Sequence, residues 1–255
     1  MQRIISILLL LFIFTSCSKN NDDDVKQVQI TFNFSHNWDG TPVLNTNFNS
    51  INYFNLNGDN LSITKLRYLI SKITFEKTTG EIFVLDGYNL VDVTNNTNLS
   101  FTPITTIPDG NYSNVSFTFG FDNDDNYNEN YNDLNSASWN VPGILGGGYH
   151  YMQLEGKFIN DMATETGYAY HTIRAVDNSG AIQVFQDTFF EVDLGPVNIT
   201  NNATFNIGMN IAEWFKNPKI WDLNVLNNAL MPNFNAQVLM FENGQNVFSL
   251  ESVNQ

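Results

Sequence analysis

The feature that most constrains the fold of this chain is the alternation of side chains in YSNVSFTFGF, residues 112 to 121. Val115, Phe117 and Phe119 fall on one side of this segment, and Asn114 and Thr118 fall on the other. Successive residues of a strand point to opposite faces, so this spacing predicts a strand with one buried face. A helix would need apolar residues every three or four positions instead.

Similar short apolar segments recur along the chain, separated by turn residues such as Asp-Gly and Thr-Gly. We predict strands at residues 28–34, 61–77, 81–85, 90–93, 112–121, 149–158, 168–176, 182–192 and 203–211. The persuasive helical segments are short, at residues 211–215 and 220–231. This pattern predicts an all-β fold, a β-sandwich of short antiparallel strands with long polar loops and one or two short helices.

Residues 61–77 fit two periodicities. A helical face would contain Leu66, Leu69, Ile70 and Ile73. A strand face would instead contain Arg67, Leu69, Ser71, Ile73 and Phe75. The β-branched residues and the Thr-Gly turn at residues 79–80 favour a strand that forms a hairpin with residues 81–85.

The N-terminus has the composition of a bacterial export signal. Residues 1–17, MQRIISILLLLFIFTSC, place Arg3 before an apolar run and end in a sequence that resembles a lipobox. Cys17, the only cysteine, is then the lipidated residue, which excludes disulfides and cysteine metal sites in the mature chain. Residues 18–25 form a polar, acidic tether, and residues 26–255 are expected to fold as one domain.

The charge of the chain excludes some partners. The formal net charge is −15 and the pI is about 4.3, which argues against nucleic acid and anionic membrane surfaces. It is compatible with cation binding, and the abundant Asn, Thr and Tyr also fit sugar binding. No second apolar stretch approaches the ~18 residues of a membrane-spanning helix.

The chain has three histidines, and each falls among apolar residues of a predicted strand. Residues two apart lie on the same face of a strand. His36 therefore shares a face with Phe34, His150 with Met152, and His171 with Ile173, and we expect all three histidines to face the core. A core histidine that is hydrogen-bonded to the backbone would explain any one of them. Their convergence would form a metal site.

Imidazoles with a thioether from Met152 suit copper better than magnesium or calcium, and zinc would also accept them. The set includes no thiolate and no evident carboxylate.

A second cluster of polar side chains occupies DNDDNYNENYND, residues 122–133. Its oxygen-bearing residues roughly follow the ligand spacing of an EF-hand loop, and they are Asp122, Asp124, Asn126, Asn128 and Asp133. Tyr127 stands where that loop needs glycine, and strands flank the segment. The two interpretations are a calcium loop and a solvated acidic loop.

Four segments together resemble the MbnP-like domain, named for a methanobactin-associated periplasmic copper-binding protein. They are ITKLRYLISKITF, YSNVSFTFGFD, GGGYHYMQLEGKF and YAYHTI, in the family's order and spacing over residues 26–248. Many Bacteroidetes lipoproteins look similar. The resemblance implies a β-sandwich that binds one copper ion through histidines, with His150 and His171 at the matching positions and His36 as a third candidate.

In some family members a tryptophan oxidised to kynurenine by a partner dihaem peroxidase assists copper binding. This chain departs from that pattern, because residues 145–148 read Leu-Gly-Gly-Gly where the family has a segment rich in Met and Trp. The candidate modified tryptophans are therefore Trp38, two residues from His36, and Trp139, the nearest one upstream of His150.

These observations predict an outer-membrane lipoprotein, on the cell surface or the periplasmic face, that captures or delivers copper. The candidate partners are a dihaem peroxidase and a TonB-type receptor. We expect no enzymatic activity, because the chain has no G-x-S-x-G elbow, phosphate-binding loop, dinucleotide fingerprint or cysteine nucleophile. The alternatives are a glycan-binding or adhesive lipoprotein with a calcium-stabilised loop, and a hydrolase with a carboxylate pair.

Overall fold

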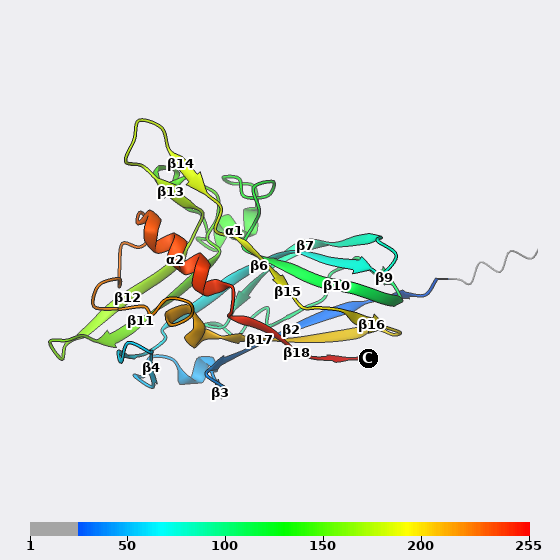
Figure 1. The fold of residues 1–255 in the computed structure, drawn as a ribbon, viewed down its shortest axis with the longest axis horizontal. Helices are drawn as coiled ribbons and strands as arrows, with labels where there is room; N and C mark the ends of the chain where they lie inside the picture. Colours follow the sequence, from blue (N-terminus) through cyan, green and yellow to red (C-terminus); the bar gives the residue numbers. More distant parts are fainter. Residues whose placement is uncertain (1–24) are drawn as a thin grey trace, which may run out of the picture.

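The computed structural model describes residues 25–255, so the export signal and Cys17 lie outside the described residues. Within them a nine-stranded sheet and a five-stranded sheet pack face to face, with few and short helices (Figure 1). The predicted all-β sandwich is therefore confirmed.

The larger sheet contains the strands that carry the candidate site. Its members are β4 (Tyr53–Phe54), β5 (Asn60–Leu61), β6 (Lys65–Lys77), β7 (Ile82–Asp92), β10 (Gly110–Phe119), β11 (Met152–Ile159), β12 (Glu165–Thr172), β15 (Phe190–Asp193) and β16 (Val197–Ile199). The smaller sheet consists of β2 (Ile30–Trp38), β3 (Thr41–Pro42), β8 (Ser100–Phe101), β17 (Ala203–Asn210) and β18 (Phe248–Asn254).

Short elements complete the fold. Two strand pairs lie apart from the main sheets: β1 (Gln27–Val28) with β9 (Ile107–Pro108), and β13 (Ala175–Asp177) with β14 (Val184–Gln186). The helices are α1 (Asn132–Ser136), α2 (Phe234–Gly244) and three 3₁₀ turns, η1 (Asn45–Asn47), η2 (Gly143–Leu145) and η3 (Ile211–Phe215). None of the helices in residues 25–255 has the length and apolar character needed to cross a membrane.

Aromatic side chains fill the space between the two sheets. Phe32 of β2 stacks on Phe205 of β17, with ring centroids 5.2 Å apart, and meets Phe75 of β6 across the core at 6.4 Å. The pairing of β2 with β17 is parallel, unlike the antiparallel pairing predicted for the sandwich. These two strands are far apart in sequence, so no hairpin turn fixes their relative direction.

A bulge in β6 explains its ambiguous periodicity. The register shifts between Ser71 and Ile73, and Lys72 between them has a φ of +47°. The even-numbered Tyr68 and Ile70 face the core before the bulge, and the odd-numbered Ile73 faces it after the bulge. The strand prediction is confirmed, as is its hairpin with β7.

The helix predicted at residues 220–231 is wrong, whereas the one at residues 211–215 is present as the 3₁₀ turn η3. Residues 220–231 form an irregular loop instead of a helix, because the carboxylate of Asp59 accepts hydrogen bonds from the backbone N–H of Leu223 and the side-chain amide of Asn224. The main helix, α2, begins later, where the Asn233 side chain accepts the N–H of Ala236 as an N-cap.

Residues 122–149, including α1, cover part of the outer face of the larger sheet. A small apolar cluster seals this contact, and its fully buried members are Leu69, Phe121, Leu134, Trp139 and Tyr149. The larger sheet is thus buried on both faces at this place, and polar side chains on its outer face are partly withdrawn from water.

Candidate functional site

Strand pairing gathers polar residues on the outer face of the larger sheet. Arg67 of β6 lies directly opposite Gln153 of β11, and Gln153 lies directly opposite His171 of β12. The neighbouring Leu154 and Tyr170 belong to the core between the sheets. Because neighbours on a strand face opposite ways, His171 points away from that core. Its expected inward orientation is therefore wrong.

His150 reaches the same outer face through an irregular segment before β11. Its backbone N–H and its Nδ1–H both donate to the carbonyl oxygen of Trp139, at 3.0 and 2.9 Å. Its ring lies 5.3 Å from that of His171, at an interplanar angle of 82°. Met152 is instead packed in the core between the sheets, so the expected shared face of His150 and Met152 is wrong. Alternation fails because β11 begins only at Met152.

The two nitrogens of His150 have different environments. Nδ1 must carry a proton, because a carbonyl oxygen can only accept. Nε2 is buried and has no hydrogen-bond partner among the described residues. Burial lowers the pKa of His150 to about 4, so the ring is neutral at pH 7 and Nε2 holds a free lone pair. A buried, unpaired nitrogen is costly, and a bound metal ion would satisfy it.

His171 has a carboxylate partner that the sequence did not reveal. Its Nε2 lies 2.9 Å from Oε1 of Glu155, and the same oxygen lies 2.7 Å from the ammonium of Lys65. The hydrogen bond from His171, followed by that from Lys65, lowers the pKa of Glu155 to about 2 against the effect of burial. An ionised carboxylate can only accept, so Nε2 of His171 carries the proton.

Trp139 lies beside His150, and Arg67 packs against Trp139. The guanidinium of Arg67 lies 5.0 Å from the centroid of the Trp139 ring and donates to Gln153 at 2.6 Å. The Trp139 ring centroid is 5.7 Å from that of His150. Trp38 lies elsewhere, stacked on Tyr53 and donating to a backbone carbonyl. Of the two candidate modified tryptophans, only Trp139 therefore adjoins the histidine pair.

His36 does face the core, as expected, and it does not join the other two histidines. Its Nε2 is 2.9 Å from the hydroxyl of Tyr68, and burial lowers its pKa to about 4. Within residues 25–255 no three His, Cys, Asp or Glu side chains are grouped closely enough to hold a metal ion. The structure thus brings together two of the candidate ligands, His150 and His171.

In the acidic loop, most of the candidate calcium ligands make hydrogen bonds within the protein. Asn126 and Asn128 accept the backbone N–H groups of Tyr149 and Gly148. The carboxylate of Asp133 accepts from Tyr88, and that of Asp122 pairs with Lys72 at 2.5 Å. These oxygens point to separate partners, and the two asparagines tie the loop to the segment that leads to His150.

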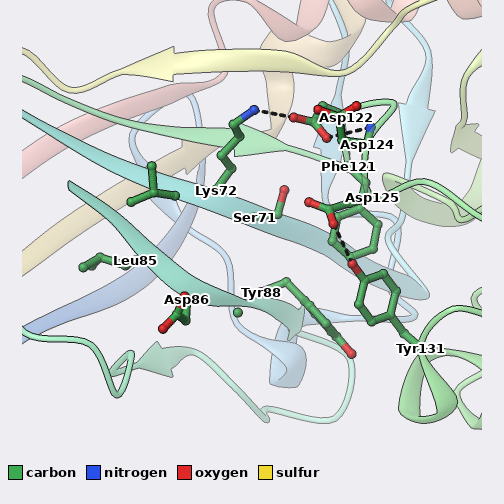
Figure 2. Close-up of a pocket in the computed structure, with 12 residues that line it drawn as sticks. Ser71, Lys72, Leu85, Asp86, Tyr88, Phe121, Asp122, Asp124, Asp125 and Tyr131 are labelled. Carbon is green, nitrogen blue, oxygen red and sulfur yellow. Dashed lines mark hydrogen bonds and ion pairs between the residues drawn. The ribbon is translucent and has the colours of Figure 1, made fainter. Parts of the chain in front are cut away.

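A pocket of about 420 Å³ lies beside this loop (Figure 2). Its acidic rim includes Asp86 and Asp124, and Figure 2 shows Asp125 bonded to the Tyr131 hydroxyl, an interaction of 3.0 Å. Asp86 likewise accepts from Thr105. Asp86 and Asp125 of the acidic rim therefore already have hydrogen-bond partners within the protein.

The family model for MbnP matches residues 27–232. The solved structure of MbnP from Methylosinus trichosporium is similar to this chain at 12% sequence identity and a TM-score of 0.49, over 77% of this chain and 80% of that one. No curated protein matches the chain.

Proposed function

The chain belongs to the MbnP family, and from this premise we propose that it binds copper through His150 and His171 and serves in the capture or delivery of that metal. The observation that carries the proposal is the buried, unpartnered Nε2 of His150, in a ring whose centroid lies 5.3 Å from that of His171. The copper is the cargo of this protein.

The separation of the two rings suits a single ion. A metal–imidazole bond of about 2 Å places the ion roughly 3 Å from each ring centre, so one ion can reach two imidazoles whose centres are within about 6 Å. The observed 5.3 Å between His150 and His171 meets this condition.

The chemistry of the donor set favours copper among common metals. Magnesium and calcium require six or more oxygen ligands, whereas imidazole nitrogens suit copper. Structural zinc takes four ligands, while here the nearest carboxylate, Glu155, is already held by Lys65 and His171.

The proposal includes a location and partners. An export signal ending at Cys17 supports a lipoprotein of the outer membrane, on the surface or the periplasmic face. A dihaem peroxidase or a TonB-type receptor would act with it, and we propose a binding role and no catalysis.

Cys17→Ser should move the protein from the membrane to the soluble fraction, and unchanged fractionation would contradict the lipid anchor.

Copper loading tests the binding function. The purified protein, incubated with excess Cu(I) or Cu(II) and desalted, should retain one copper per chain, and it should retain less zinc after the same treatment. Metal analysis by mass spectrometry measures both. Copper at background level after both treatments would refute the proposal.

A further inference from the structure

We infer that Glu155 is a positioning residue that holds the Nε2–H of His171 and thereby presents the opposite nitrogen, Nδ1, to copper. His150 presents Nε2. This inference rests on the proposed copper binding, and it assigns one ligand atom in each ring and a role to a carboxylate on β11.

His150 shows how a hydrogen bond to one ring nitrogen leaves the other nitrogen free to bind a metal. Its Nδ1–H is held by the Trp139 carbonyl at 2.9 Å, and this bond fixes the tautomer and leaves Nε2 as the acceptor. A ligating histidine in a metal site usually donates its other N–H to a carbonyl or carboxylate in this way. His171 has the mirror arrangement, with Nε2 held by Glu155 at 2.9 Å.

The Nδ1 atom of His171 makes no hydrogen bond to the described residues, whereas its Nε2 bonds to Glu155. For Nε2 to bind copper, the ring would have to give up the proton on Nε2 and break its 2.9 Å hydrogen bond to Glu155. Coordination through Nδ1 keeps that bond. Each ring then offers one lone pair, and both supporting hydrogen bonds survive metal binding.

Rigid strand pairing holds Glu155 in place. Glu155 of β11 lies directly opposite Lys65 of β6, and the ammonium of Lys65 lies 2.7 Å from Oε1 of Glu155. On the other side, His171 lies opposite Gln153, so Glu155 reaches it along the diagonal of the β11–β12 ladder. The carboxylate is thus anchored between two strands of one sheet, as the orientation of a ligand requires.

Substitution of Glu155 tests the role in affinity. Loss of such an outer partner typically weakens metal binding about 10- to 100-fold, and we expect this for Glu155→Leu in a Cu(I) competition titration. Glu155→Gln keeps an oxygen acceptor and should restore most of the affinity. The matched control is Glu165→Leu, which removes a carboxylate from the same hairpin, where Glu165 pairs only with Lys157. Equal affinity for Glu155→Leu and Glu165→Leu would overturn the inference.

Nitrogen NMR of the histidine rings tests the ligand atoms. In the metal-free protein, long-range ¹H–¹⁵N spectra should show His150 protonated at Nδ1 and His171 protonated at Nε2. Addition of Ag(I), a diamagnetic substitute for Cu(I), should shift Nε2 of His150 and Nδ1 of His171 upfield. A shift of His171 Nε2 instead would refute the role of Glu155 and leave copper binding intact. If no histidine nitrogen shifts, the proposed function itself is wrong.

Discussion

Replacement of either His150 or His171 by alanine is expected to weaken copper binding by more than about 100-fold, because loss of a supporting partner alone costs about 10- to 100-fold and each variant removes a ligand. The two rings, 5.3 Å apart, hold the ion together. Either substitution leaves a single imidazole. Competition titration with a chromogenic Cu(I) chelator measures the affinity of each variant.

Two substitutions in the core are the controls for this prediction. His36→Gln and Met152→Leu alter residues first considered as ligands, and both lie in or face the core between the sheets. Neither should change copper affinity more than a few-fold. A loss with His36→Gln comparable to that with His150→Ala would contradict the two-histidine site.

The pH dependence of this binding follows from the pKa of His150. Protons compete with a metal only near or below the pKa of its ligand, and burial lowers that pKa to about 4. A histidine with its ordinary pKa of ~6.5 would instead lose affinity near that value. At His150, the loss from proton competition should begin only below about pH 5, since the neutral ring predominates above its lowered pKa.

Gly148→Ala is expected to destabilise the protein by about 3 kcal/mol. Gly148 has a φ of +73°, and an added Cβ would lie 2.3 Å from Oδ1 of Asn126. The left-handed conformation costs an L-residue about 1–2 kcal/mol. Displacement of Asn126 also breaks its bond to the N–H of Tyr149, which contributes about 1 kcal/mol. Urea unfolding monitored by tryptophan fluorescence measures the difference.

Gly143→Ala is the matched control, because Gly143 has no positive φ and open space around its Cβ position. It should change stability by less than about 0.5 kcal/mol. Because Asn126 anchors the chain next to His150, Gly148→Ala should also weaken copper binding, whereas Gly143→Ala should not. Similar stabilities of the two variants would contradict the proposed role of the glycines.

The strands could be predicted where apolar residues alternate along the chain. In β10 the alternating Val115, Phe117 and Phe119 all belong to the core between the sheets, although Ser116 and Thr118 on the other face are buried as well. The alternation in β6 is interrupted by the bulge at Lys72, and residues 122–149 bury Leu69 on the outer face, which is why helical spacing emerged there. Bulges and second layers depend on tertiary contacts, and a local pattern does not contain them.

The candidate site was predicted in part for the same reason. His150 and His171 could be selected as two of only three histidines, but alternation assigned both to the wrong face. Glu155 depends on the register of β11 against β12 and β6, which a single sequence does not specify. The role of the three glycines at residues 146–148 was not evident from the sequence either. All three have positive φ angles, and Gly147 and Gly148 permit the close approach of Asn128 and Asn126.

Anomalous diffraction from a crystal of the copper-loaded protein, measured on both sides of the copper edge, would locate the proposed ion between His150 and His171. We expect one strong peak about 2 Å from Nε2 of His150 and about 2 Å from a ring nitrogen of His171. A peak at His36, at Met152 or in the acidic loop, with none between His150 and His171, would contradict it.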